Sequence, residues 1–274
     1  MNKVKLLRDN GVIPVLVFDG GKLPSKSQQE SKRDKSRREN LERAEQLLLK
    51  GKRSEARECF QKAVDITPAI AHQLIRVLRQ EHVEYVVAPY EADAQMAYLC
   101  TSGLVHAVIT EDSDLIAYSC PRVLFKMDHM GHGDEIVYAN IGQSQELALA
   151  DFIPQMVLEM CILSGCDYLD SLPKVGLKTA HDWIRRHRNY QSALAVAKLN
   201  GRVVPEEYEG AFEQALLTFL HHRVYHLADE LMTHVNPLPP TLGPDTDLSF
   251  LGPYPTQRAS CLSSLTPILA LFCP

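Results

Sequence analysis

The sequence lacks three features that would assign it quickly to a class of protein. Its net charge is only −5 over 274 residues, so a nucleic-acid binder is not indicated by overall charge and must be argued from local charge. The seven cysteines include no CxxC pair, and Cys161 and Cys166 have no zinc-like partners nearby. No run reaches the ~18 consecutive apolar residues of a membrane-spanning helix. We therefore expect neither a zinc-binding module nor a membrane protein.

The bulk composition is that of an ordinary folded protein. At 274 residues the chain can form one large domain or two small ones, and 45% of its residues are hydrophobic. An odd number of cysteines and no recognisable signal peptide favour a reducing, intracellular compartment. His129 and His132 flank a glycine-containing turn, and we interpret them as turn residues rather than metal ligands.

Carboxylates follow the apolar runs of this sequence in a regular way. Three runs predicted to be buried strands each stop at acidic residues, and an apolar helix stops shortly before another acid. The acids are Asp19 after residues 12–18, Glu91 and Asp93 after 83–88, Asp112 and Asp114 after 105–110, and Asp167 after the helix 151–163. Because the carboxyl ends of parallel strands meet at one edge of a sheet, we expect these side chains to converge there.

Carboxylates packed together repel and cannot all remain ionised without a compensating charge. Mg²⁺ or Mn²⁺, which prefer oxygen ligands, would remove the conflict. Two such ions about 4 Å apart suit phosphodiester hydrolysis, because one activates a water and the other stabilises the leaving oxygen. Taken one at a time, the acids are better explained as N-caps or solvated loop residues. The whole set favours a metal site.

The order of the predicted elements indicates an α/β protein with a mostly parallel sheet flanked by helices. Strands are expected at 12–18, 83–88, 105–110, 123–127 and 135–138, and helices at about 25–50, 54–66, 69–81 and 91–101. From residue 151 the pattern becomes all-helical, at 151–163, 176–187, 190–198 and 206–222. The expected organisation is an α/β core at 1–150, a helical region at 151–236 and an irregular or disordered tail at 237–274.

The helix expected at about 25–50 is locally basic. Residues 22–43 contain eight Lys and Arg and four acids, an excess of +4 in a chain with a net charge of −5. Lys26, Arg33 and Arg37 are separated by seven and four residues, so they fall close to one helix face. Such a face is often a solvated surface laced with ion pairs. Next to a metal cluster, it favours phosphate binding.

A short loop joins two helices after Asp167. The segment Pro173-Lys174-Val175-Gly176 leads into a helix whose N-terminus presents backbone N–H groups to an anion. Lys174 and Lys178 add positive charge, which suits a DNA phosphate backbone without base reading. An ordinary helical hairpin explains the spacing about equally well.

These motifs closely resemble the flap endonuclease (5′ nuclease) superfamily, and in particular its DNA-repair exonucleases. The resemblance covers about residues 1–252 and is carried by six segments. They are Val17-Phe18-Asp19-Gly20, Leu23-Pro24-Ser25-Lys26, residues 51–60 (GKRSEARECF), 88–95 (APYEADAQ), 109–115 (ITEDSDL) and 161–169 (CILSGCDYL).

The resemblance implies a 5′→3′ double-stranded DNA exonuclease and 5′ flap endonuclease that hydrolyses phosphodiester bonds with two Mg²⁺ ions, for which Mn²⁺ can substitute. It assigns Asp19 and Glu91 to the first metal site, and Asp93, Asp112, Asp114 and Asp167 to the second. It makes Lys26 and Arg33 the catalytic contacts to the scissile phosphate, with Arg37 beside them, in a basic helical arch at about 25–50. Residues 164–176 match a helix-two-turn-helix that binds duplex DNA, here through Lys174, Gly176 and Lys178, and that holds K⁺ near Ser164, Ser171 and Val175.

The family also implies a biological setting. Its substrates are DNA duplexes with a 5′ end, nick, gap or flap, its processes are mismatch repair and recombination, and its location is the nucleus. Mismatch-repair proteins would bind a C-terminal tail that this sequence does not carry.

Three departures from the family pattern set further expectations. The family begins Met-Gly and has a metal-binding Asp and a DNA-wedging helix before its Asp-Gly strand, and none of these precedes Asp19 here. Lys174-Val175-Gly176 stands where the family has Gly-x-Gly, and the family pattern is lost after Leu251-Gly252. We therefore expect a truncated or alternatively spliced product with a fold incomplete at its N-terminus and with impaired activity.

Three other interpretations remain open. A catalytically dead DNA-binding remnant would share every feature except an intact metal site. An RNA-cleaving relative could have the same acidic sheet edge, although the helix-two-turn-helix favours DNA by resemblance. A tetratricopeptide-like adaptor is suggested by Ala56, Phe60, Ala63 and Pro68, but we find one copy of a repeat that needs about three to form a core.

Overall fold

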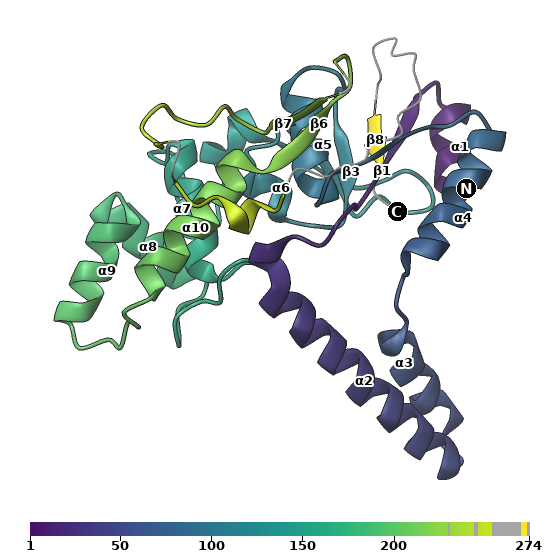
Figure 1. Cartoon of the computed structure of the whole chain (residues 1–274), viewed down its shortest axis with the longest axis horizontal. Helices are drawn as coiled ribbons and strands as arrows, with labels where there is room; N and C mark the ends of the chain where they lie inside the picture. The colour runs from purple at the N-terminus through teal and green to yellow at the C-terminus, as the bar shows by residue number, and fades with distance from the viewer. Residues whose placement is uncertain (230, 244–245, 254–269, 273–274) are drawn as a thin grey trace. The chain divides into compact units, whose positions relative to one another are not determined.

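The computed structural model describes residues 1–229, 231–243, 246–253 and 270–272 (Figure 1). The chain divides into two compact units. The larger unit consists of residues 1–25 and 83–274, and the smaller of residues 26–82. The division falls inside the α/β core expected at 1–150, because the basic helix belongs to the smaller unit. The domain boundaries drawn from the sequence stay a prediction.

Within the described residues, a six-stranded sheet lies in the larger unit, in the order β2-β1-β8-β3-β4-β5 (Figure 1). The strands are β1 (Pro14–Phe18), β2 (Glu84–Val87), β3 (Val108–Thr110), β4 (Arg122–Phe125), β5 (Asp134–Val137) and β8 (Ala270–Phe272). All neighbours are parallel except β4 and β5, which are antiparallel. The prediction of an α/β fold with a mostly parallel sheet is confirmed.

The central strands are buried along their whole length. Every residue of β1 and of β3 is buried, as expected for parallel strands that are covered on both faces. Helix α1 (Asn2–Asp9) packs on β1, and α5 (Ala92–Thr101) contacts both β1 and β3. Because β1 and β2 run parallel, with Phe18 opposite Val87, their carboxyl ends lie at the same edge of the sheet.

Helices form the second layer of the larger unit. They are α6 (Asp114–Ala117), α7 (Pro154–Ser164), α8 (Leu177–His187), α9 (Tyr190–Leu199) and α10 (Tyr208–His221), with the 3₁₀ turn η2 (Tyr138–Gln143) before α7. The aromatic rings of Tyr190 and Phe212 stack with centroids 4.0 Å apart. The buried Glu159 accepts hydrogen bonds from Tyr190 N at 2.8 Å and from Gln155 at 2.9 Å, which joins α7 to the start of α9.

A β-hairpin after α10 contradicts the expectation of an all-helical second half. Strands β6 (Arg223–His226) and β7 (Leu231–His234) pair antiparallel. Gln95 of α5 holds this hairpin, because its side chain donates to Tyr225 O at 2.9 Å and accepts from Tyr225 N at 2.7 Å. A fully buried glutamine that makes both bonds is stabilising, whereas an unpaired one would cost free energy.

The expectation of an irregular tail at 237–274 is wrong for two segments. Leu251, in the 3₁₀ turn η3 (Ser249–Leu251), is fully buried, and the hydroxyl of Tyr90 donates to Pro253 O. Strand β8 lies between β1 and β3 and pairs with residues 14–16 and 108–109. Within the described residues β1 thus has a partner on both sides. Residues 244–245, 254–269 and 273–274 of the predicted tail lie outside the described part of the chain.

The smaller unit is helical. It contains α2 (Ser27–Leu49), α3 (Arg53–Ala63) and α4 (Pro68–Gln80), which confirms the helices expected at about 25–50, 54–66 and 69–81. Helices α2 and α3 lie side by side (Figure 1), joined through Gly51 with a φ of +74°. Of the 23 residues of α2 only Ala44 is buried, so α2 presents most of its length to solvent. None of the helices that the structure describes is both long enough and apolar enough to cross a membrane.

Candidate metal and DNA-binding site

Asp19 directly follows β1 and is held against the start of α5. Its carboxylate Oδ1 accepts a hydrogen bond of 2.8 Å from the N–H of Ala92, the first residue of α5. The next residue, Gly20, donates its N–H to Tyr90 O at 2.6 Å, and a Cβ on Gly20 would lie 2.0 Å from Ala88 O. A residue with a side chain cannot make this approach, so Gly20 fixes Asp19 beside the N-terminus of α5.

Glu91 and Asp93 lie at the junction between β2 and α5, which confirms the placement predicted from their spacing. Glu91 is the N-cap residue, and Asp93 lies in the first helical turn, where a carboxylate suits the helix dipole. Burial raises the pKa of Asp93 well above its usual value, and the charges of Asp112, Asp114, Asp19 and Glu91 raise it further. Five carboxylates from three strand ends are therefore close enough to repel one another.

Asp112 and Asp114 come from the turn after β3. The N–H of Asp112 donates to Thr110 Oγ1, and the N–H of Asp114 donates to Asp112 Oδ1, both at 3.0 Å. Asp114 begins the short helix α6. A local hydrogen-bonded turn thus sets the spacing between the two carboxylates.

Asp167 approaches this group from the end of the helical hairpin. Burial raises the pKa of the Cys166 thiol to about 11, and the charges of Asp114 and Asp167 both contribute to the increase. The hydroxyl of the next residue, Tyr168, lies 3.2 Å from that of Tyr118 at the end of α6. The charge of Asp114 thus reaches the residue next to Asp167, and the assignment of Asp167 to the same site stays a prediction.

Two tyrosines beside the acids were not predicted from the sequence. Burial raises the pKa of Tyr118 and of Tyr168 well above its usual value, and the charges of Glu91 and Asp114 add to the effect. Both hydroxyls stay protonated at neutral pH. The buried rings exclude water next to the carboxylates, which lowers the local dielectric constant and strengthens the repulsion between the charges. The only local signal was that Tyr168 directly follows Asp167, which does not distinguish it from a core aromatic residue.

The donor chemistry at this edge of the sheet suits a hard divalent cation. All the acids supply oxygen ligands, and the repulsion that raises the pKa of Asp93 is the repulsion that a cation would relieve. Among the described residues, no three His, Cys, Asp or Glu side chains are grouped closely enough to hold an ion as they stand. Because the carboxylates repel one another, we expect them to approach within ligand distance of a common point only when a cation is bound there. The residues fit Mg²⁺ or Mn²⁺, and their assignment as ligands stays a prediction.

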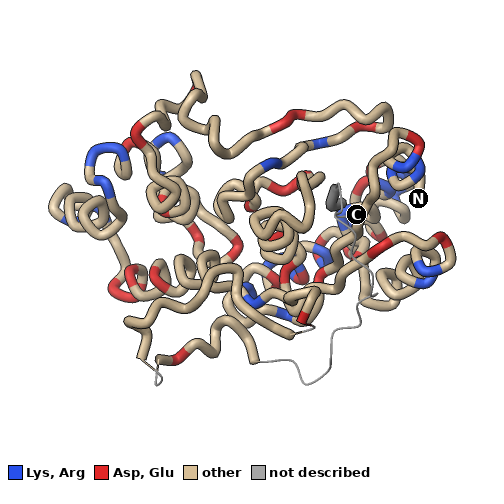
Figure 2. The backbone as a smooth tube through the Cα atoms, turned by 90° about the horizontal axis from the view of Figure 1, so that it is seen from above, with Lys and Arg blue, Asp and Glu red and all other residues tan. Residues whose placement is uncertain are grey.

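The basic residues belong to the smaller unit. Lys26 ends the 3₁₀ turn η1 (Pro24–Lys26) and is partly buried, whereas Arg33 is exposed on α2. Figure 2 shows Lys and Arg positions interspersed with Asp and Glu positions along the backbone. The phosphate-binding roles of Lys26 and Arg33 stay predictions.

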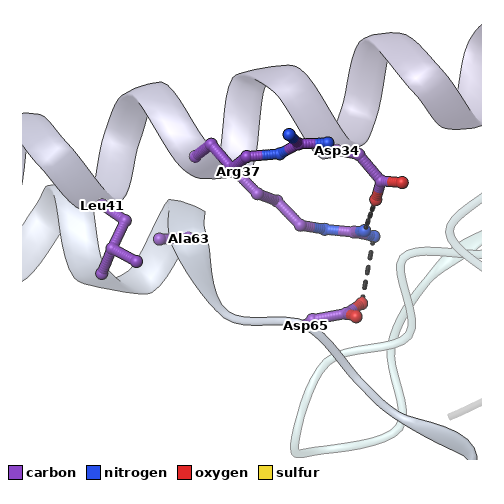
Figure 3. A pocket seen from close by; sticks show the side chains of 6 residues that line it. Asp34, Arg37, Leu41, Ala63 and Asp65 are labelled. Carbon is purple, nitrogen blue, oxygen red and sulfur yellow. Dashed lines mark hydrogen bonds and ion pairs between the residues drawn. The ribbon is translucent and has the colours of Figure 1, made fainter.

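Arg37 lies between two acids. Its Nη1 is 2.8 Å from Asp34 Oδ1, and its Nη2 is 3.3 Å from Asp65 Oδ1, in the segment after α3 (Figure 3). These three residues, with Arg38, Leu41 and Ala63, line a pocket of about 250 Å³ between α2 and α3. A phosphate that binds Arg37 would therefore compete with both carboxylates. Sequence reasoning considered only phosphate binding by Arg37 and missed its ion pair with Asp65.

The loop between α7 and α8 has the form of the predicted helix-two-turn-helix. Gly165 ends α7 with a φ of +100°, and a Cβ there would lie 3.2 Å from Ser171 N. Ser164 Oγ donates to Cys161 O at 2.8 Å, and Val175 is buried. The duplex-binding roles of Lys174, Gly176 and Lys178, and the K⁺ site, stay predictions.

Lys174 departs from the usual backbone conformation. Its φ is +62°, in the left-handed region that disfavours a residue with a Cβ. Gly176 is the N-cap of α8, and Lys178 lies in the first turn of that helix. The family pattern has a glycine where Lys174 stands, which the positive φ explains.

Comparison with known proteins shows which proteins this chain resembles. Two family models match, the XPG N-terminal domain over residues 1–40 and the XPG I-region over residues 82–167, and together these segments contain all six acids. Exonuclease 1 of Arabidopsis thaliana is 51% identical over 274 residues, and that of Oryza sativa subsp. japonica is 50% identical over 260 residues. The chain is thus similar to exonuclease 1 proteins along nearly its whole length.

The similarity covers nearly all of this chain and a smaller share of its relatives. It spans 99% of the chain and 37% of the Arabidopsis protein, and 95% of the chain and 31% of the rice protein. Among solved structures, the catalytic core of Rad2 in complex with DNA substrate matches with a TM-score of 0.59 and 19% identity, over 86% of this chain and 72% of that one. This match shows that the exonuclease 1-like chain has the 5′ nuclease fold.

Proposed function

We propose that this chain is the nuclease region of a metal-dependent 5′→3′ double-stranded DNA exonuclease that also cleaves 5′ flaps. The observation that carries the proposal is the group of carboxylates around Asp93, contributed by the ends of β1, β2 and β3. Besides burial, the influences that raise the pKa of Asp93 are the charges of four other carboxylates, a repulsion that a bound cation would relieve.

Each acid has an expected role in holding two Mg²⁺ ions, or Mn²⁺ in their place. Asp19 and Glu91 would hold the first ion, and Asp93, Asp112, Asp114 and Asp167 the second. Bound at this position, the ions supply an activated water and stabilisation of the leaving oxygen. The protein contributes the positioning, through the Gly20 contact and the turn at Asp112.

DNA would be bound through its phosphates. Lys26 and Arg33 are proposed to contact the scissile phosphate, with Arg37 nearby once it exchanges its carboxylate partners for DNA. The loop 164–176 is proposed to bind duplex backbone through Lys174, Gly176 and Lys178, with K⁺ near Ser164, Ser171 and Val175. The substrates would be duplexes with a 5′ end, nick, gap or flap, in nuclear DNA repair, including mismatch repair and recombination.

A nuclease assay tests the proposal. The 274-residue chain is incubated with a 5′-recessed duplex labelled at either end, with Mg²⁺, with Mn²⁺ or with chelator. We expect mononucleotides from the 5′ end only with metal, and loss of at least tenfold in rate in Asp114→Asn. The matched control is Glu146→Gln, which removes one exposed carboxylate far along the chain from the predicted ligands.

Two outcomes separate this proposal from its two rivals, a catalytically dead DNA-binding protein and an RNA-cleaving enzyme. Metal-independent binding of the duplex without cleavage would support a catalytically dead DNA-binding protein. Metal-dependent cleavage of RNA but not DNA would contradict the substrate assignment.

A further inference from the structure

Two cysteines of the larger unit lie against the same backbone carbonyl. Cys100 is in the last turn of α5, and Cys120 lies between α6 and β4. Both are buried, with 6% and 1% of their surface exposed. Their thiols each donate to Arg122 O, at 4.0 Å and 3.9 Å respectively. Sequence reasoning could not predict this shared contact, because twenty positions separate the two residues.

Both sulfurs lie within 4.0 Å of one carbonyl oxygen, and each thiol shifts the pKa of the other. The interaction with the Cys120 thiol lowers the pKa of Cys100 to about 7 against the opposing effect of burial, and Arg122 and His106 act in the same direction. The same interaction, with burial and the charge of Cys100, raises the pKa of Cys120. One thiol is thus suited to act as the nucleophile and the other as its proton-bearing partner.

The other described cysteines differ from this pair. Burial raises the pKa of Cys161 to about 12 and that of Cys166 to about 11, so their thiols are unreactive at neutral pH. Cys59 belongs to the smaller unit, which contains neither Cys100 nor Cys120. Cys100 and Cys120 therefore differ from the other described cysteines in their shared contact with Arg122 O and in the lowered pKa of Cys100.

We propose that Cys100 and Cys120 form a reversible disulfide when the protein meets hydrogen peroxide. The Cys100 thiolate attacks a peroxide oxygen, the O–O bond breaks, and the departing hydroxide takes up a proton to become water. The Cys120 sulfur then attacks the resulting sulfenic acid, the S–O bond breaks, and the Cys120 proton leaves with the hydroxyl as a second water. Two thiols are oxidised by two electrons, and one peroxide is reduced to two waters.

The bond would close the loop that carries Asp112 and Asp114. That loop runs from the end of α5 through β3, the acidic turn and α6. Oxidation would tie the far end of α5, whose first turn holds Asp93, to the segment before β4. The proposal does not depend on the proposed nuclease function, because disulfide formation is measured without DNA or metal.

Peptide mapping of the full chain tests the proposal. Trypsin releases residues 80–122 as one peptide with both thiols, since no Lys or Arg occurs between Arg79 and Arg122. After treatment with peroxide and alkylation, we expect this peptide to be unalkylated and about 2 Da lighter than the dithiol, for the two hydrogens lost. A further cut at residues 111–114 separates the cysteines into two peptides that remain linked until dithiothreitol is added.

Variants assign the roles of the two thiols. Cys120→Ser should trap a sulfenic acid at Cys100 that reacts with dimedone, whereas Cys100→Ser should leave Cys120 unmodified. Cys59→Ser is the control and should form the disulfide as the wild type does. Alkylation of both thiols in the peroxide-treated wild type, or a link from either one to a different cysteine, would overturn the proposal, and this result does not depend on the variants folding.

Discussion

Replacing Gly20 with alanine tests how the strand ends hold the acids. Gly20 follows Asp19, and its N–H donates to Tyr90 O at 2.6 Å. An added Cβ would lie 2.0 Å from Ala88 O and 2.6 Å from Pro89 O, both of them backbone atoms that cannot rotate away. The substitution therefore has to separate the end of β1 from the end of β2.

The size of the effect follows from these distances. Cβ atoms essentially never come within 3.0 Å of another heavy atom, so the gap to Ala88 O must widen by at least 1.0 Å. That movement strains the Gly20–Tyr90 bond and the 2.9 Å bond from Gly21 N to Pro89 O. Overpacking costs about 1–3 kcal/mol, and each hydrogen bond contributes about 1 kcal/mol net. We expect Gly20→Ala to lower the free energy of unfolding by about 2–4 kcal/mol.

The neighbouring glycine provides a matched control. A Cβ on Gly21 would lie 3.5 Å from Pro89 O, an ordinary contact, so Gly21→Ala should change the stability by no more than about 1 kcal/mol. Thermal unfolding followed by circular dichroism should show a Tm for Gly20→Ala lower by about 5–15 °C than for Gly21→Ala. Calorimetric titration with Mg²⁺ should show weaker binding in Gly20→Ala, because Asp19 moves with the strand end.

The result that would refute this reasoning is a similar Tm for the two variants. It would mean that β1 and β2 can separate by an ångström at no cost, and that Gly20 does not fix the position of Asp19. A lower Tm for Gly20→Ala than for Gly21→Ala, with unchanged Mg²⁺ affinity, would show that the contact matters for folding but not for the site.

Three further predictions concern charge and backbone conformation. Asp93→Asn should stabilise the metal-free protein by about 1 kcal/mol at neutral pH, because a raised pKa makes ionised Asp93 destabilising. The gain should grow as pH rises above the pKa of the unfolded state and should be absent at low pH. Urea unfolding of both proteins across pH measures it, and the same stability curve for the variant and the wild type would contradict it. Lys174→Gly should raise the free energy of unfolding by about 1 kcal/mol, because glycine adopts the positive φ without strain. Lys174→Asn removes the charge but tolerates that backbone conformation, so any loss of duplex binding in this variant reports on the charge alone. An equal loss of binding to single strands would show that the loop does not bind duplex DNA specifically. Replacing Lys26 or Arg33 with glutamine should weaken binding about equally for all DNA sequences and lower the salt slope by roughly 1; a sequence-selective loss would exclude a phosphate contact.

The sequence determined the central strands and the placement of the acids at their ends. The runs 12–18, 83–88 and 105–110 are mostly apolar, which is typical of strands in a parallel sheet, and the structure has β1, β2 and β3 within them. The long basic helix and the helical hairpin after residue 150 were also predictable, because helical periodicity and turn residues act over a few positions. The positions of Glu91 and Asp93 followed from the same local rules.

Only the tertiary structure decided the features that depend on distant partners. β6 exists as a strand because β7 pairs with it and because Gln95, 130 positions away, bonds to both polar backbone groups of Tyr225. β8 lies between β1 and β3 through pairing across most of the chain, which no local period encodes. The ion pair between Arg37 and Asp65 and the shared contact of Cys100 and Cys120 with Arg122 O likewise arise from packing, because each depends on which residues the fold brings together rather than on their neighbours in sequence.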